Sequence, residues 1–142
     1  MSTRTNQARG FSLIELLIVI TVVGLLLAVA LPSYTRYVLR SHRSSAVTGV
    51  LDLASRQARY YTTNNTYTTS MTALGYPADP MPLTDSSNRY YDLSVASATA
   101  TAFTVRAVPV NAQTKDTCRT YTYTDLGVKS VSSGTLGDCW KQ

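Results

Sequence analysis

The sequence has few of the residues that catalysis or metal binding requires. Its 142 residues include one histidine, His42, and two cysteines, Cys118 and Cys139. No pair of acidic residues falls in a recognisable catalytic motif, and there is no glycine-rich phosphate loop and no metal-ligand spacing. We therefore expect no enzymatic activity, no cofactor and no metal. His42 lies among arginines and is interpreted as a solvated or interfacial side chain.

Charge is almost absent from the long apolar segment Phe11–Leu31. Its one charged residue is Glu15, the only glutamate in the chain. About 20 helical residues cross a bilayer, so the segment is long enough to span one. An acid inside the bilayer costs about 2.5–3.5 kcal/mol on insertion scales for the comparable aspartate. The position of Glu15 therefore needs a physical reason, and the simplest is a side chain that snorkels to the headgroups.

Basic residues exceed acidic ones, giving a formal net charge of +5. Two arginines, Arg4 and Arg9, precede the apolar segment, and a larger group follows it, opposed locally only by Asp52. We interpret this second group as a solvated helix face near anionic lipid headgroups. Counting positive charges does not decide which end of the segment is cytoplasmic. The second group consists of Arg36, Arg40, Arg43, Arg56 and Arg59.

The two cysteines suggest an oxidising compartment. A cysteine pair in a small exported domain is typical of a disulfide, which would stabilise a loop of this size by roughly 3 kcal/mol. Two free buried thiols are the alternative. The disulfide interpretation places the C-terminal part of the chain outside the cytoplasm.

Periodicity predicts one helix from about Phe11 to Thr62, bent near Pro32. Apolar residues recur at three- and four-residue steps in its second half, and Asn64 and Asn65 end it. The apolar positions are Val47, Val50, Leu51, Ala54, Ala58 and Tyr61.

Residues 66–89 are rich in proline, serine and threonine and are predicted to form a loop. Alternation then predicts strands around Tyr91–Val95, Phe103–Val105 and Tyr121–Tyr123, with a short fourth strand at Val128–Val131. Short connections favour an antiparallel sheet. The fold class is therefore α+β, with a small sheet packed on the amphipathic half of a long helix.

Two ordinary interpretations of the N-terminus compete. A secretory signal peptide would use Ala28-Val29-Ala30 as its cleavage site, leaving Leu31 as the new terminus. A signal anchor would remain uncut. Neither accounts for Glu15, and the first does not explain why helical periodicity continues beyond Pro32.

The stretch RGFSLIELLIVI resembles the class III signal of type IV prepilins: a short basic leader ending in Gly10, then Phe11, then Glu15 in an apolar helix. The resemblance implies cleavage between Gly10 and Phe11 by prepilin peptidase and N-methylation of the Phe11 amine. Glu15 of one subunit would then neutralise the Phe11 amine of a neighbour, because buried ions need partners.

The similarity continues beyond the signal, where the chain resembles PilE-type minor pilins. It is carried by Pro32-Ser33-Tyr34, by the segments RSHR and ASRQARYY, by Asn65-Thr66-Tyr67 and by Asp138-Cys139-Trp140. It implies a disulfide-bounded region from Cys118 to Cys139, and a helix that loosens between Gly24 and Pro32 on assembly, where both residues are poor helix formers.

The resemblance implies a structural subunit that joins or primes a filament used for twitching motility, adhesion or DNA uptake. Expected partners are other major and minor pilins, prepilin peptidase and the inner-membrane assembly machinery. The subunit would occupy the inner membrane with its C-terminal domain in the periplasm, then the extracellular pilus. The expected parts are a leader (1–10), a transmembrane and filament-core helix (11–31), its amphipathic continuation (32–62) and a globular head (63–142).

Three other functions share parts of this pattern. A type II secretion pseudopilin shares the signal and the helix, and a major pilin shares the architecture. A DNA-binding minor pilin would use a basic patch with nearby aromatic side chains for stacking. Asp116, Asp125 and Asp138 dilute that patch, so DNA is not an expected partner. The patch consists of Arg106, Lys115, Arg119, Lys129 and Lys141.

Overall fold

The structure is a computed structural model that describes residues 11–86 and 88–141. It divides into two compact units, one up to Thr35 and one from Arg36 onward. Helix α1 (Leu13–Asn64) contributes to both. The leader, including Gly10 of the expected cleavage site, lies outside the described residues.

The ends of α1 follow local chemistry. The backbone N–H of Glu15 donates to Ser12 Oγ at 3.2 Å, so Ser12 caps the first turn. At the other end Asn65 has φ 51° and its N–H donates to Tyr61 O at 2.8 Å, a left-handed stop that asparagine tolerates. The predicted stop at the two asparagines is confirmed, two residues beyond Thr62. The helix continues through Gly24 and Pro32.

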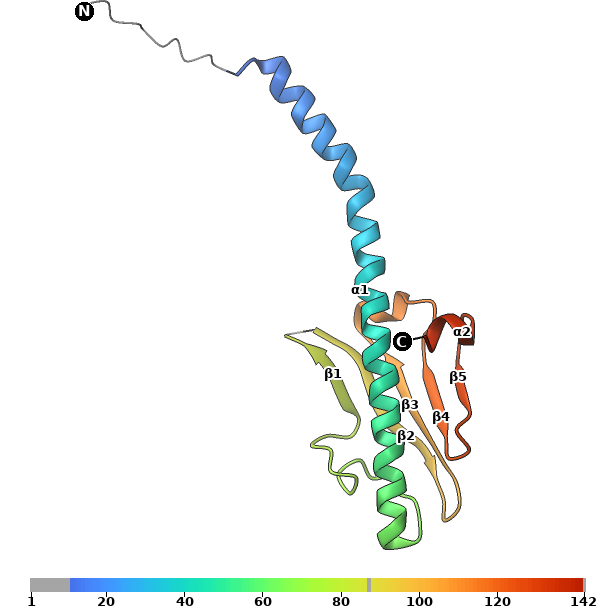
Figure 1. Ribbon diagram of the computed structural model, residues 1–142. Coiled ribbons are helices and arrows are strands. Elements are labelled where there is room, and N and C mark those ends of the chain that lie inside the picture. The colour runs from blue at the N-terminus through green and yellow to red at the C-terminus, as the bar shows by residue number, and fades with distance from the viewer. Residues whose placement is uncertain (1–10, 87, 142) are drawn as a thin grey trace, which may run out of the picture. The chain divides into compact units, whose positions relative to one another are not determined.

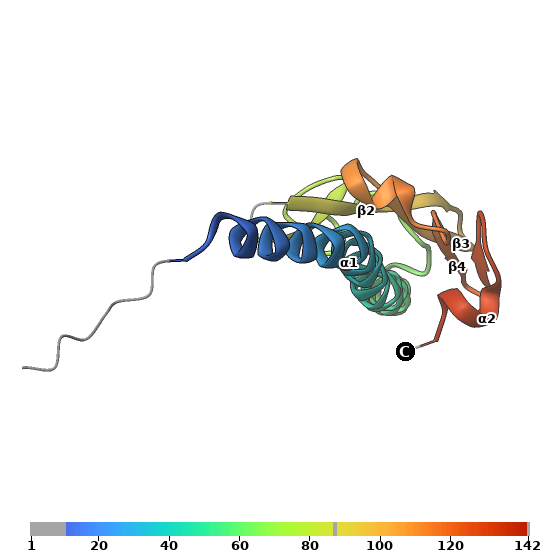
Figure 2. The same ribbon diagram turned by 90° about the horizontal axis from the view of Figure 1, so that it is seen from above.

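The second unit contains a five-stranded antiparallel sheet in the order β1-β2-β3-β4-β5 (Figure 1). This confirms the predicted α+β fold class. The part of α1 from Arg36 onward, called its head part below, lies on one side of the sheet, and Figure 2 shows the strands arranged around it. The elements after α1 are β1 (Met81–Asp85), β2 (Asn88–Ala98), β3 (Phe103–Pro109), the 3-10 helix η1 (Asn111–Lys115), β4 (Tyr121–Thr124), β5 (Lys129–Val131) and the short helix α2 (Leu136–Cys139).

The core forms where alternating strand residues meet the apolar face of α1. Val105 and Tyr121 are fully buried on the sheet, and Val50 and Leu53 are fully buried on the helix. The predicted helix stripe is wrong at Ala58, which is exposed. The buried stripe ends instead on Gln57. Its side-chain amide donates to Thr68 O and accepts from the Thr68 N–H.

The expected loop over residues 66–89 contains the unpredicted strand β1. Pro82 argued against a strand because proline cannot donate a ladder hydrogen bond. In the structure β1 is an edge strand that pairs only with β2, and an edge strand is where a sheet tolerates proline. The other predicted strands are confirmed, and β2 is longer than its alternating pattern because a bulge interrupts the register between Val95 and Ser97.

Candidate functional site

The unit up to Thr35 is an uncovered apolar surface. Every described residue from Phe11 to Thr35 is exposed, including Leu13 at 78% and Leu25 at 70%. Helix α1 is long and apolar enough to cross a membrane. Apolar surface of this extent marks a membrane or protein contact, because monomeric soluble proteins rarely expose it.

Glu15 is the only charged side chain between Phe11 and Thr35. No cation of this segment can therefore pair with it through a side chain. Its position three residues after Ser12 gives the Ser-x-x-Glu spacing of a capping box. A carboxylate in the first turn also lies close to the positive end of the helix dipole. The sequence reasoning missed this second possible role, although the spacing was visible.

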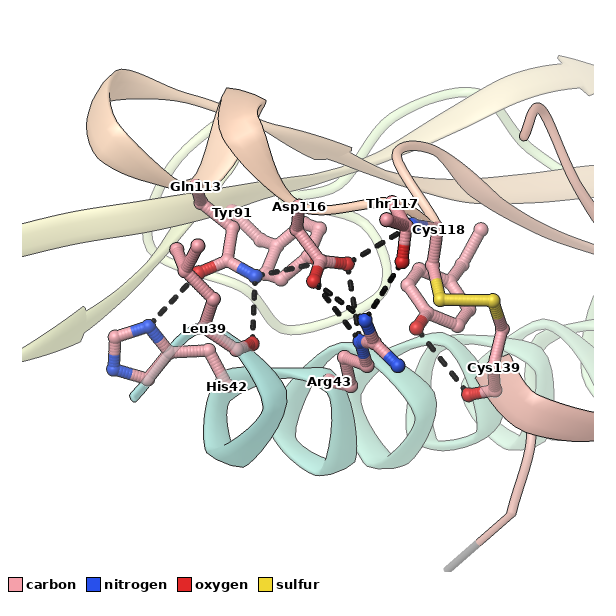
Figure 3. A network of polar contacts seen from close by, with 10 residues as sticks. Leu39, His42, Arg43, Tyr91, Gln113, Asp116, Thr117, Cys118 and Cys139 are labelled. Carbon is pink, nitrogen blue, oxygen red and sulfur yellow. Dashed lines mark hydrogen bonds and ion pairs between the residues drawn. A yellow bond between two sulfur atoms is a disulfide. The ribbon is translucent and has the colours of Figure 1, made fainter. Parts of the chain in front are cut away.

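An ion pair anchors the head part of α1 to the segment before the disulfide (Figure 3). Arg43 Nη2 lies 2.8 Å from Asp116 Oδ1 and 2.9 Å from Thr117 Oγ1, while Nε contacts both carboxylate oxygens at 3.0 and 3.1 Å. The Asp116 side chain is 2% exposed and that of Arg43 is 16% exposed. Burial alone would lower the pKa of Arg43, but the hydrogen bond and charge of Asp116 raise it above its ordinary value. The expectation that Arg43 belongs to a solvated face is wrong.

Gln113 of η1 forms a second anchor beside the first. Its Nε2 donates to Leu39 O at 2.9 Å and to Tyr91 Oη at 3.2 Å, so its Oε1 faces His42 Nδ1 at 3.0 Å. His42 Nε2 lies 3.1 Å from Asp85 Oδ2, and the ring stacks on Tyr90 at 4.1 Å. Both ring nitrogens of His42 thus face a side-chain oxygen of another element. The expectation of a solvated His42 is therefore wrong, because the ring joins α1 to β1, β2 and η1.

The same network reaches the disulfide. The Cys118 N–H donates to Asp116 Oδ2 at 3.1 Å, and Tyr121 Oη donates to Cys139 O at 3.2 Å. Cys118 and Cys139 are bonded, with their Cα atoms 5.7 Å apart, which confirms the predicted disulfide. Burial raises the pKa of Tyr91 to about 12 and also raises the pKa of Tyr121, so both phenols stay neutral; Tyr121 donates its hydrogen bond and Tyr91 accepts one from Gln113. The arrangement is structural, and no described group of histidine, cysteine and acidic side chains has the geometry to hold a metal.

Comparison with known proteins decides the family. Residues 32–122 match the family described as type IV minor pilin ComP, DNA uptake sequence receptor, and residues 5–31 match the prokaryotic N-terminal methylation motif. This chain belongs to that family of type IV minor pilins. The prepilin resemblance of the N-terminus is thereby confirmed at the level of the motif.

Curated relatives of this pilin are also type IV pilins. It is 30% identical over 105 residues to the type IV major pilin protein PilA of Myxococcus xanthus, covering 73% of this chain and 45% of PilA. It is 39% identical over 72 residues to the type IV major pilin protein PilE1 of Neisseria gonorrhoeae, covering 51% of this chain and 44% of PilE1. The chain thus spans less than half the length of these relatives.

Solved structures agree on the fold. A type IV pilin from Shewanella oneidensis aligns with a TM-score of 0.50 at 23% identity, covering 73% of this chain and 99% of that one. The non-core minor pilin PilV of Neisseria meningitidis aligns with a TM-score of 0.51 at 23% identity, covering 70% of this chain and 92% of that one. At this identity the likeness shows the fold alone.

The basic residues predicted as a DNA-contact patch do not share one face of this pilin. Arg106 pairs across the sheet with Thr122, on the side of β3 that faces away from the core. Lys129 pairs with Tyr123 and lies 5.3 Å over the Trp140 ring, on the opposite side. The remaining three lie outside the strands: Lys115, Arg119 and Lys141.

Proposed function

We propose that this minor pilin is a structural subunit of a type IV pilus. Residues 11–31 would hold it in the inner membrane before assembly and pack against other pilins afterwards. The observation that carries the proposal is the fully exposed apolar segment with one acidic side chain, which lies within the matched methylation motif. Twitching motility, adhesion and DNA uptake would be activities of the assembled filament. The head would lie in the periplasm and then outside the cell.

Processing would create the missing partner of Glu15. Prepilin peptidase would cut between Gly10 and Phe11 and methylate the new amine of Phe11. That amine is a cation beside the membrane, and Glu15 is an acid within the apolar segment. Pairing between neighbouring subunits would neutralise both and fix their axial register. Removing one member of a buried ion pair typically costs about 3–5 kcal/mol.

The capping position of Glu15 makes a sharp test possible. Glutamine replaces glutamate in a capping box but carries no charge, so Glu15→Gln separates the two roles. If the charge pair drives assembly, Glu15→Gln reduces the subunit in sheared pili at least tenfold, as Glu15→Ala does. Membrane levels of both variants stay at the wild-type value.

Ser12→Ala is the matched control, because it removes the cap and leaves the carboxylate. We expect it to cost about 1 kcal/mol of helix stability and to leave the abundance of the subunit in pili nearly unchanged. Normal incorporation of Glu15→Gln together with loss of Ser12→Ala would assign Glu15 to helix capping and contradict the charge pair.

DNA binding is a second candidate function. It is favoured by the description of the matched family as a DNA uptake sequence receptor. Arg106 is the candidate contact on the outer sheet face, where it bonds to Ser94 at 3.1 Å. Affinity for duplex DNA would fall between 50 and 200 mM salt, and Arg106→Ala would lower the logarithmic slope by about one. An unchanged slope relative to the exposed control Arg59→Ala would remove Arg106 from the interface.

A further inference from the structure

A cluster of cations lines a small pocket at the start of the head. Arg36, Arg40 and Arg43 are spaced by four and three residues, so they share one face of α1. Lys115 lines the pocket from η1, and Leu39, Asp116 and Thr117 complete the lining. Four cationic side chains and one acidic side chain therefore line the pocket.

The one acid is already engaged. Asp116 is buried and accepts three hydrogen bonds from Arg43, so it neutralises that guanidinium. Among residues 11–86 and 88–141, Arg40 and Lys115 form no ion pair, and both side chains are exposed. Figure 3 shows Arg43 held by Asp116 and Thr117, which fixes this wall of the pocket. The site thus offers pre-positioned positive charge to an anion.

The pocket volume limits the anion to a small group. It measures about 90 Å³. A nucleobase or a drug-sized ligand needs a pocket several times larger. A phosphate group fits this size, and arginine and lysine are the side chains that bind phosphate best.

The chain ties this pocket to the membrane. Arg36 follows Leu31, the last residue of the apolar segment, by five residues. Five residues reach at most about 18 Å when fully extended, and the polar layer of a bilayer leaflet is about 5–8 Å thick. Even a fully extended connection therefore keeps Arg36 within about 10–13 Å of the polar layer, and a helical connection, which rises about 1.5 Å per residue, brings it to that layer.

We propose that this pocket binds the phosphate of an anionic membrane phospholipid while the subunit awaits assembly. The inference rests on the proposed membrane location of residues 11–31. It gives a use to the arginines that leave positive-inside counting undecided. Bound lipid would also hold the head close to the bilayer surface.

Native mass spectrometry of the full-length chain, released from detergent micelles containing equal amounts of phosphatidylglycerol and phosphatidylcholine, tests this proposal. We expect the wild type to retain phosphatidylglycerol preferentially. The double variant Arg40→Ala/Lys115→Ala should weaken that retention by about 10- to 30-fold, the effect of two cations near a charged surface. Arg59→Ala/Lys129→Ala removes the same charge from exposed residues outside the pocket lining and should retain lipid like the wild type.

Three outcomes would overturn the proposal. One is equal retention of the two lipids by the wild type, and another is equal loss in both double variants, which would indicate net charge alone. The third is unchanged lipid retention in Arg40→Ala/Lys115→Ala with lost binding of duplex DNA or lost incorporation into pili, which would assign the pocket to another partner. Displacement of the lipid by millimolar inorganic phosphate would support a site for the phosphate group. It would also show that the rest of the phospholipid is not required for binding. Wild-type incorporation into pili, measured separately, tests the pilus function independently.

Discussion

Single side chains decide how the head of this pilin is held on its helix. Asp116 and Gln113 are both buried polar residues, and each satisfies its hydrogen bonds by reaching α1. Within residues 11–86 and 88–141, no buried side-chain nitrogen or oxygen lacks a hydrogen-bond partner. Buried polar groups of this kind make the packing specific, because any displacement leaves a desolvated group unpaired.

Arg43→Ala should destabilise the head strongly. It would leave the Asp116 carboxylate buried without its cation, a change that costs about 3 kcal/mol at the low end of buried pairs. Denaturant titration of the full-length chain in micelles, followed by Trp140 fluorescence, measures this loss. Arg59→Ala, an exposed arginine on the same helix, should change stability by less than about 0.5 kcal/mol. Arg43→Ala/Asp116→Ala should recover part of the loss, and a purely additive double variant would contradict the ion-pair account.

The side chains around Asp52 predict that the stability of the head depends on pH in the acid range. Burial acts to raise the pKa of Asp52, but the hydrogen bond from Tyr76 at 2.6 Å and the contact with Arg56 at 2.8 Å outweigh it and lower the pKa. A lowered folded-state pKa stabilises above the unfolded value of about 4, and this stabilisation is lost as the pH falls through the folded value. Tyr76→Phe should flatten this acid limb of stability against pH. An unchanged limb would show that Asp52 does not contribute.

The segment from η1 to α2 depends on one covalent link. The disulfide joins residues separated by 21 positions and connects the β4 region to the C-terminal helix. In the chain-entropy model a loop of this size is worth about 3 kcal/mol. Reduction should lower the free energy of unfolding by that amount, and intact mass should rise by two hydrogens. Two alkylatable thiols without reductant would contradict the bond.

Strands and helices of this pilin differ in how far the sequence could predict them. Alternation predicted β2, β3 and β4 because their inward-facing residues, such as Leu93, Val105 and Tyr121, are buried in the core. It missed β1 because Pro82 is acceptable only at a sheet edge, and edge position is a property of the assembled sheet. The cysteine pair predicted the disulfide. The partners of Arg43 and His42 could not be found from sequence, because Asp116 and Gln113 lie about 70 residues away along the chain.

The two units of the molecule expose different kinds of surface. The unit up to Thr35 exposes apolar side chains and one acid, and it is the part that the proposed assembly uses. The unit from Arg36 onward buries its own core and presents a varied surface. Assembly and head-specific binding can therefore be altered separately by mutation.

The N-terminus of the mature protein tests the central claim most directly. The intact mass should be measured, and the N-terminal peptide sequenced, on protein purified from its native membrane. The pilus account predicts a chain that begins at Phe11 and carries one methyl group on its amine, with residues 11–31 retained. A chain that begins at Leu31 would show an ordinary secreted domain. It would contradict the role of Glu15 and the proposed membrane location together.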